Sequence, residues 1–453
     1  MSKGIEQIGK KDVAWSYLAT FFLIGSNIIL LPVILHEMPA SMVAVWSIFQ
    51  VISGLVHLLD FGFRPSFARN VSYIFTGVQE LQVEGVAKIE KSDTINYTLL
   101  KTVLHAMRTF YRWMAISVLV MMLLFGSLYI YYVVMPKYNE SHTDLLIAWF
   151  MLVAVNSYNL YTLYYDALLL GKGYVKLSQQ ITIVGQELYL AISVVLIVAG
   201  CGLTAIVSAQ FVSVFVRRIL SYRTFFKPEL VNELNMVHEK NFKEILRVIS
   251  PNAVKVGLTN FGGFLVSRSS VLMGSAFLTL EQVACYSITF QVTEVIAKCS
   301  IVYFQANIPK IAKFRAKRDI MELRRLFRTS IVSMFMVYVV FGGAFLMLGD
   351  YAMQLLKSDT QFLPLTLCYV LMFISLLEHN HSVASGFIAA DNRIPFFIPS
   401  ILSGVATVVL LWLFLSLLKL ELWGVILAPG FAQLVYQNWK WPYVVIKELY
   451  FSK

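Results

Sequence analysis

The residues of this sequence that are best suited to chemistry are ionisable side chains inside long apolar runs. A charge inside such a run is costly, so it marks either a functional site or a structural ion pair. At a helical rise of ~1.5 Å per residue, Arg268 lies about 25 Å along a helix from Pro251. By the same measure Glu294 lies about 21 Å from Ile308 on the next run, so two antiparallel helices would bring both groups to one depth. Lys298 follows Glu294 by four residues and shares its helix face.

This cluster has two interpretations. In the functional one, Arg268, Lys298 and Lys255 line a polar, net-cationic cavity that binds an anionic headgroup. In the structural one, Glu294 neutralises Arg268 and Lys298 and holds two helices together. One carboxylate cannot balance two cations, so a positive charge remains for a phosphate group.

Further polar side chains lie in other apolar runs. Asn156 and Asn159 lie in a tyrosine-rich run, where amides either hydrogen-bond a sugar or join neighbouring helices. Glu187, Glu378 and His379 are the candidates for coupling to an ion, because a carboxylate or an imidazole can exchange protons inside a membrane. The alternative for His379, and for the nearby His381, is that they merely lie at a helix end.

The sequence lacks the short motifs of several enzyme classes. It contains no GxxxxGK[ST] phosphate loop, no HExxH, no G-x-S-x-G and no Cys/His zinc spacing. Its four cysteines lie in apolar runs, and none forms a CxxC pair. We therefore predict a protein that is not an enzyme and that has no metal site and no cofactor.

The elements that must position these residues are long apolar segments. The chain of 453 residues is 58% hydrophobic and 14% charged, whereas soluble proteins carry about 25% charged residues. Since a bilayer needs roughly 20 apolar residues per helix, the sequence predicts an all-α, polytopic membrane protein with about twelve transmembrane helices. The predicted spans are 13–35, 40–63, 113–134, 145–170, 178–199, 202–220, 251–275, 281–308, 329–349, 361–388, 394–418 and 421–446.

The distribution of the cations predicts the orientation. The net charge is +11, and most Lys and Arg residues fall in 64–112, 217–247 and 310–328, with Arg217 and Arg218 assigned to the second of these segments. Loops rich in Lys and Arg stay in the cytoplasm. An even number of spans then places both termini in the cytoplasm and only Lys137, Lys357 and Lys419 outside. Because the cations form short clusters between spans, a nucleic-acid partner is not expected.

The spans divide into two halves. We predict an N-terminal six-helix lobe over 1–220, a cytoplasmic linker over 221–250 and a C-terminal six-helix lobe over 251–453. The stretch 22–31 is weakly similar to 264–273, which predicts a parallel internal repeat. A helix is also expected from about Asn96 into the third span.

One short stretch combines residues typical of a turn. In Asp60-Phe61-Gly62-Phe63-Arg64-Pro65 the proline cannot continue a regular helix, and the glycine permits a tight turn. Asp60 is placed to pair with Arg64 or Arg69. We interpret the stretch as a structural hinge or cap.

The first 135 residues resemble a known family. Lys11-Asp12-Val13-Ala14-Trp15-Ser16-Tyr17, then Gly25-Ser26-Asn27, Leu31-Pro32 and Trp46-Ser47-Ile48-Phe49 resemble the opening of bacterial polysaccharide-repeat-unit flippases. The most specific part is Leu59-Asp60-Phe61-Gly62-Phe63-Arg64-Pro65, followed by Ala68-Arg69-Asn70-Val71-Ser72-Tyr73-Ile74 and Gly77. These O-antigen and capsule (Wzx-type) transporters belong to the multidrug/oligosaccharidyl-lipid/polysaccharide exporter superfamily. Beyond residue 135 the similarity is one of layout only.

The resemblance implies a fold and a substrate. The fold is two six-helix lobes around a central cavity. The substrate is a polyprenyl-diphosphate-linked oligosaccharide, moved by alternating access from the cytoplasmic to the outer face of the inner membrane during lipopolysaccharide or capsule synthesis. The implied partners are the lipid bilayer, the glycan polymerase and other assembly proteins. The family has no short catalytic signature to transfer to this chain.

Other functions fit the composition less well. A cation-coupled multidrug exporter of the same superfamily would need carboxylates in the N-terminal lobe, where Glu187 is the main one. A membrane glycan polymerase or ligase would need a large external loop, yet 136–144 and 350–360 are short. A scaffold protein would not need charges inside its spans.

Overall fold

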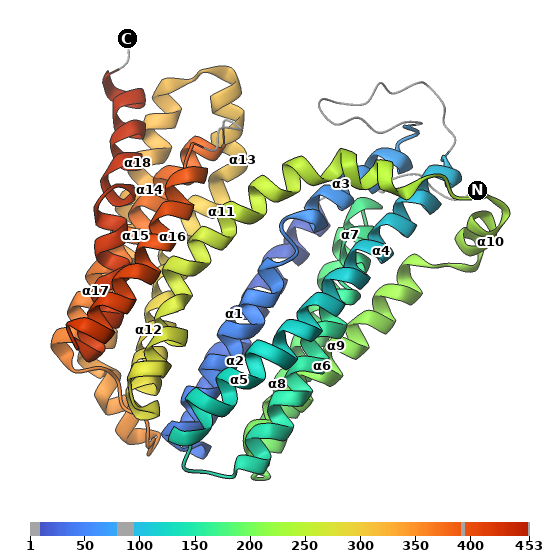
Figure 1. Cartoon of the computed structure of the whole chain (residues 1–453). Coiled ribbons are helices and arrows are strands. Elements are labelled where there is room, and N and C mark those ends of the chain that lie inside the picture. The colour runs from blue at the N-terminus through green and yellow to red at the C-terminus, as the bar shows by residue number, and fades with distance from the viewer. Residues whose placement is uncertain (1–9, 79–94, 391–394, 452–453) are drawn as a thin grey trace. The chain divides into compact units, whose positions relative to one another are not determined.

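The structure is a computed structural model, and it describes residues 10–78, 95–390 and 395–451. Every regular element in these ranges is a helix, and no strand occurs among them (Figure 1). The predicted all-α fold class is confirmed. Each of the twelve predicted spans overlaps one or more consecutive helical elements.

The helices up to residue 236 belong to the first part of the chain. They are α1 (Lys10–Glu37), α2 (Ala40–Leu58), α3 (Phe63–Phe75), α4 (Tyr97–Met121), η1 (Met122–Gly126), α5 (Ser127–Tyr129), η2 (Ile130–Val134), η3 (Met135–Lys137), α6 (His142–Tyr161), α7 (Tyr164–Gly171), α8 (Val175–Val198), α9 (Gly202–Phe225) and α10 (Pro228–Met236).

The remaining helices follow from residue 242. They are α11 (Phe242–Phe277), α12 (Leu280–Ser300), α13 (Val302–Lys317), α14 (Ile320–Leu355), α15 (Leu365–Ala389), α16 (Phe397–Trp412), η4 (Leu413–Leu417), α17 (Glu421–Leu434), α18 (Gln437–Ile446) and η5 (Lys447–Phe451). Elements η1, η2, η4 and η5 are single π-helical turns within longer helices.

The helix predicted from about Asn96 is present. The Asn96 side chain accepts a hydrogen bond from the backbone N–H of Leu99 at 2.9 Å, which caps α4. From this cap the chain runs as one helical segment of 41 residues to Lys137. The helix that contains the predicted span 113–134 therefore begins well before that span, as expected from the sequence.

Seven helical segments among the described residues are long and apolar enough to cross a membrane. They are Ala40–Leu58, Tyr97–Lys137, His142–Gly171, Val175–Val198, Gly202–Phe225, Ile320–Leu355 and Phe397–Leu417. The other long helices of the C-terminal part include α11 and α15. These carry Arg268 and the run Glu378-His379-Asn380-His381, which lower their hydropathy.

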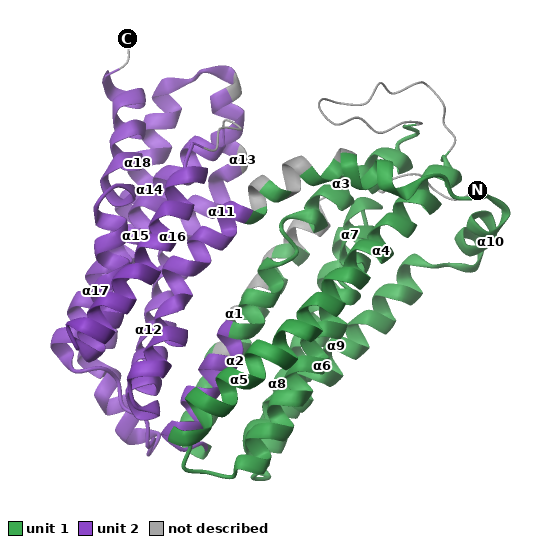
Figure 2. Ribbon diagram, in the orientation of Figure 1, with its two compact units in different colours: residues 1–37, 52–257 green, residues 38–51, 258–453 purple. Residues whose placement is uncertain are grey.

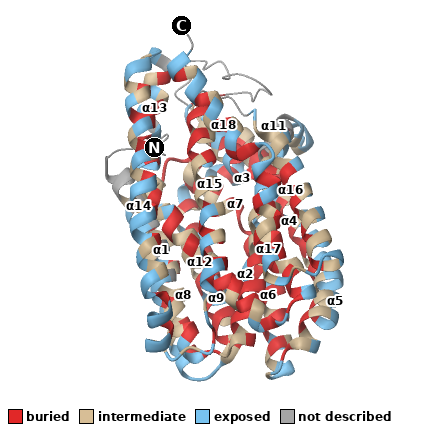
Figure 3. Cartoon of the chain, turned by 90° about the vertical axis from the view of Figure 1, so that its left-hand side faces the viewer, coloured by how far each residue is buried: buried red, intermediate tan, exposed pale blue. Residues whose placement is uncertain are grey.

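Several helices present apolar side chains outward along their length. On α14 exposed positions recur from one end to the other (Figure 3). Its exposed apolar side chains include Val332, Phe335, Met336, Val339, Val340, Phe341, Met347 and Leu348. A soluble protein rarely exposes so large an apolar surface, whereas a lipid bilayer covers it at no cost. The chain is therefore a multi-pass membrane protein.

The chain forms two compact units (Figure 2). Unit 1 comprises residues 1–37 and 52–257, and unit 2 comprises residues 38–51 and 258–453. Helices α2 and α11 each contribute residues to both units. The domain boundaries proposed from the sequence, with a linker over 221–250, stay a prediction.

The turn predicted at Asp60–Pro65 joins α2 to α3 in unit 1. Phe61 and Gly62 both adopt left-handed backbone conformations, with φ of 46° and 73°. Asp60 accepts a hydrogen bond from the backbone N–H of Arg64 at 3.1 Å and another from the hydroxyl of Tyr111 at 2.5 Å. Asp60 thus caps α3 with its side chain. The most specific part of the family resemblance is a tight turn of the fold.

Helix α3 packs closely on α7. A Cβ atom added at Gly171 would lie 2.6 Å from the carbonyl oxygen of Ala68 and 2.6 Å from the Cβ of Val71. Only glycine allows this approach, because such short contacts are not tolerated. The close contact between α3 and α7 holds α7 in place, and α7 carries Asp166, a residue of a buried charge network.

Candidate functional site

The cationic cluster predicted from the sequence forms in unit 2. Thr279 closes the short connection between α11 and α12 with a capping box, in which Thr279 and Gln282 bond each other's backbone. This places Arg268 and Glu294 opposite each other. Their Nη2 and Oε2 atoms lie 4.0 Å apart, as predicted from their depth.

Lys298 belongs to the same cluster. Its Nζ atom lies 3.9 Å from Oε2 of Glu294, four residues earlier on α12. The side chains of Arg268, Lys298 and Glu294 are 30%, 53% and 21% exposed. The structure therefore brings two cations to one carboxylate at a partly open position.

Among the described residues, no hydrogen bond uses the donors of these two cations. Hydrogen bonds between nitrogen and oxygen span about 2.7–3.2 Å, so separations of 3.9 and 4.0 Å are ion pairs without a hydrogen bond. Among the described residues Arg268 instead lies over the ring of Phe290, with 5.2 Å between its guanidinium carbon and the ring centroid. The edge of a guanidinium held by its face still offers paired donors to a phosphate.

Lys255 cannot be placed in this cluster. It is a residue of α11, but its side chain lies outside the described residues. Its role in the binding site stays a prediction.

Asn156 and Asn159 lie in unit 1, on α6, and both are buried. Asn156 donates to the hydroxyl of Ser53 at 3.0 Å. Asn159 accepts a hydrogen bond from Arg218 at 2.6 Å, and its amide nitrogen lies 3.3 Å from Nε2 of His57. These contacts match the interpretation in which the amides join helices; their proposed part in substrate binding stays a prediction.

Arg218 is the centre of a buried network in unit 1. It is 2% exposed, and it donates to Asp166 at 2.7 Å as well as to Asn159. Arg64 approaches the other oxygen of Asp166 at 3.9 Å. The network ties α6, α7 and α9 to the first turn of α3.

This network was not predicted from the sequence, where Arg218 was counted with the internal segment 217–247. Helix α9 continues to Phe225, so Arg217 and Arg218 lie within it. The available signal was that Asp166 lies in an apolar run and needs a buried cation. The positive-inside pattern counted Arg218 as a loop charge instead.

The candidates for ion coupling belong to two helices: Glu187 to α8, and Glu378 and His379 to α15. Glu187 is a half-buried residue of α8, and it makes no ion pair with the side chains that the structure describes. On α15, Glu378 accepts two hydrogen bonds from the amide of Gln433, at 3.2 and 3.1 Å. His379 donates through Nδ1 to the carbonyl of Ser375 at 2.8 Å. Ion coupling by these residues stays a prediction.

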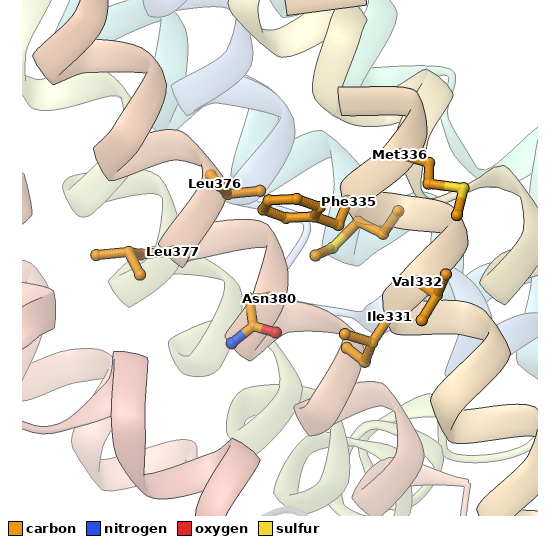
Figure 4. A pocket seen from close by; sticks show the side chains of 8 residues that line it. Ile331, Val332, Phe335, Met336, Leu376, Leu377 and Asn380 are labelled. Carbon is orange, nitrogen blue, oxygen red and sulfur yellow. The ribbon is translucent and has the colours of Figure 1, made fainter. Parts of the chain in front are cut away.

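An apolar groove of about 380 Å³ lies between α14 and α15 in unit 2 (Figure 4). Phe335, Met336, Leu376 and Leu377 are among the residues that line it, and Asn380 supplies its one polar side chain. Such a groove suits a hydrocarbon chain. Any lipid chain could fill this apolar groove, so the groove does not identify the substrate.

Comparisons with known proteins define the class of fold. No family model matches the chain, and no curated protein matches it. Among solved structures, the inward-facing conformation of a multidrug resistance MATE family transporter of the MOP superfamily matches with a TM-score of 0.66 and 15% identity, over 95% of each chain. The outward-facing conformation of such a transporter matches with a TM-score of 0.54 and 15% identity, over 98% of each chain.

A further solved structure, of MATE in the bent conformation, matches with a TM-score of 0.53 and 15% identity over 97% of this chain and 96% of the other. The chain therefore has the fold of the MATE transporters of the MOP superfamily. This is the class of fold that the resemblance in the first 135 residues implies.

Proposed function

We propose that the protein is a flippase that moves polyprenyl-diphosphate-linked oligosaccharide repeat units from the cytoplasmic to the outer face of the bacterial inner membrane. The observation that carries this proposal is the cluster of Arg268 and Lys298 around the single carboxylate of Glu294. The transporter fold and the resemblance around Asp60–Pro65 support it. The mechanism is alternating access, with both termini in the cytoplasm.

The charge of the cluster suits a diphosphate. Two cations and one carboxylate leave a net charge of +1 beside a partly open surface. A diphosphate ester carries negative charge on both phosphates, and Arg is the side chain that binds a phosphate through two parallel hydrogen bonds. An incoming diphosphate would take over the donors of Arg268 and leave Glu294 paired with Lys298.

A charge series tests this assignment in cells that depend on the protein for glycan export. Arg268→Ala should abolish most export while the protein is still made and inserted, and Arg268→Lys should retain part of it. If Arg268 only balances Glu294, the double variant Arg268→Ala, Glu294→Ala no longer strands a buried charge. Normal export by that double variant would overturn the site assignment.

A second candidate function is cation-coupled multidrug export, because two of the matched structures are of a multidrug resistance transporter. In unit 1, however, Asp166 accepts a hydrogen bond from Arg218. Asp60 accepts hydrogen bonds from the hydroxyl of Tyr111 and from the backbone N–H of Arg64. Glu187 remains the carboxylate best placed to bind a cation. Drug efflux that is driven by an ion gradient and lost in Glu187→Gln, with glycan export unaffected, would favour this second function.

The proposed function also names partners. The glycan polymerase and other assembly proteins would receive the repeat unit on the outer face. Export that continues in cells lacking this protein, but stops when the polymerase is removed, would contradict its placement before that enzyme.

A further inference from the structure

A small cleft of about 210 Å³ lies in unit 1, and none of its lining residues belongs to the cationic cluster of unit 2. Helix α4, the end of α9, helix α10 and the segment after α10 form its walls. Its charged, imidazole and aromatic lining residues are Lys101, His105, Arg108, Tyr222, Phe226 and Glu239. It thus combines basic and aromatic side chains.

The segment after α10 is held on α4 by specific contacts. The Lys101 ammonium donates to the carbonyl of Val237 at 2.8 Å. The backbone N–H of Lys240 donates to the hydroxyl of Thr102 at 2.9 Å. These hydrogen bonds join residues more than 130 positions apart in the chain. The walls of the cleft are therefore held together by tertiary contacts.

Arg108 is the cation of the cleft that remains available. The one carboxylate of the lining, Glu239, already lies 3.0 Å from Nδ1 of His105. Arg108 lies over the rings of Phe226 and Tyr164, at 5.6 and 6.0 Å from their centroids, and no carboxylate among the described residues comes within ion-pair distance of it. Aromatic faces hold a guanidinium without using its hydrogen-bond donors.

The surroundings of the cleft indicate a lipid. Phe215, Ile219 and Tyr222 recur at helical spacing on α9 and are 45%, 36% and 48% exposed. They form an apolar stripe that runs along the apolar helix α9 and ends in the cleft. An acyl chain can lie along this stripe while its headgroup occupies the cleft.

We propose that this cleft binds the headgroup of an anionic phospholipid, with Arg108 contacting the phosphate. The volume of about 210 Å³ is below the ~300–1,000 Å³ of pockets for drug-sized ligands, so a headgroup fits better than a larger solute. Basic pockets between transmembrane helices commonly bind anionic headgroups. The aromatic rings of Tyr222 and Phe226 are side chains typical of the headgroup region.

The test uses the purified full chain and measures binding of short-chain phosphatidylglycerol, phosphatidylcholine and inorganic phosphate. The wild type should bind phosphatidylglycerol in preference to phosphatidylcholine. Arg108→Gln should weaken phosphatidylglycerol binding about tenfold, the effect of one charge-assisted hydrogen bond. Arg112→Gln is the matched control, because Arg112 is an exposed arginine of the same helix that does not line the cleft; its binding should be unchanged.

A second variant, Arg108→Lys, separates the loss of a binding contact from the loss of the folded state. Arg108→Lys keeps the charge, so it should bind close to the wild type even if Arg108→Gln unfolds. Equal losses in Arg108→Gln and Arg112→Gln would show a general charge effect and would overturn the proposal. Competition by inorganic phosphate as strong as that by phosphatidylglycerol would also overturn it, because the ligand would then be a soluble anion.

Discussion

At the scale of single residues, the charged side chains of the helices form two kinds of ion pair. In unit 1, Arg218 makes hydrogen bonds to Asp166 and Asn159 at 2.7 and 2.6 Å and is almost fully buried. In unit 2, Arg268 and Lys298 stay 3.9–4.0 Å from Glu294 and are partly exposed. Short, buried bonds indicate a structural role, whereas long, open ion pairs leave the cations able to accept a ligand.

This difference predicts different effects on stability. Arg218→Ala removes the hydrogen-bonded cation of Asp166 and leaves, among the described residues, Arg64 as its ion-pair partner at 3.9 Å. It should therefore lower the free energy of unfolding by about 3–5 kcal/mol, the usual cost of breaking a buried ion pair. Arg223→Ala on the same helix, where the arginine is exposed, should change it by less than about 0.5 kcal/mol. Thermal unfolding of both purified variants measures this; equal melting temperatures would contradict the structural role of Arg218.

At the scale of helices, glycine contacts decide how closely elements approach. Gly171→Ala should destabilise unit 1 by about 1–3 kcal/mol, because the added methyl group meets Ala68 and Val71 of α3 at 2.6 Å. The control is Gly343→Ala on α14, where nothing lies within 4 Å of an added Cβ, and no loss is expected. A stable Gly171→Ala protein would show that α3 and α7 do not need this close approach.

The helices were more predictable than their polar contacts. Apolar length located each span, and the cap at Asn96 located the start of α4, because both signals are local in the sequence. The pair of Arg268 and Glu294 was predictable because α11 and α12 are consecutive and antiparallel. The bond between Arg218 and Asp166 joins residues 52 positions apart on α9 and α7, and nothing in the spacing of the sequence specifies which helices meet there.

At the scale of the whole molecule, the distribution of cations predicts the topology. Single cysteines placed in 136–144 and 350–360 should react with an impermeant thiol reagent in intact cells, and those in 221–250 and 310–328 should not. Since Cys201 is exposed, the experiment needs a parent protein in which the natural cysteines are replaced. Labelling of the basic segments from outside would contradict the orientation.

The most direct test of the central claim is the binding of a short-chain polyprenyl diphosphate to the purified protein, measured by calorimetry. The double variant Arg268→Ala, Glu294→Ala removes the cluster's arginine without stranding the carboxylate. It should bind the diphosphate about ten- to hundredfold more weakly than the wild type, whereas Arg325→Ala, at an arginine that is 74% exposed on α14, should bind normally. Wild-type affinity in the double variant would contradict the claim that Arg268 binds the diphosphate.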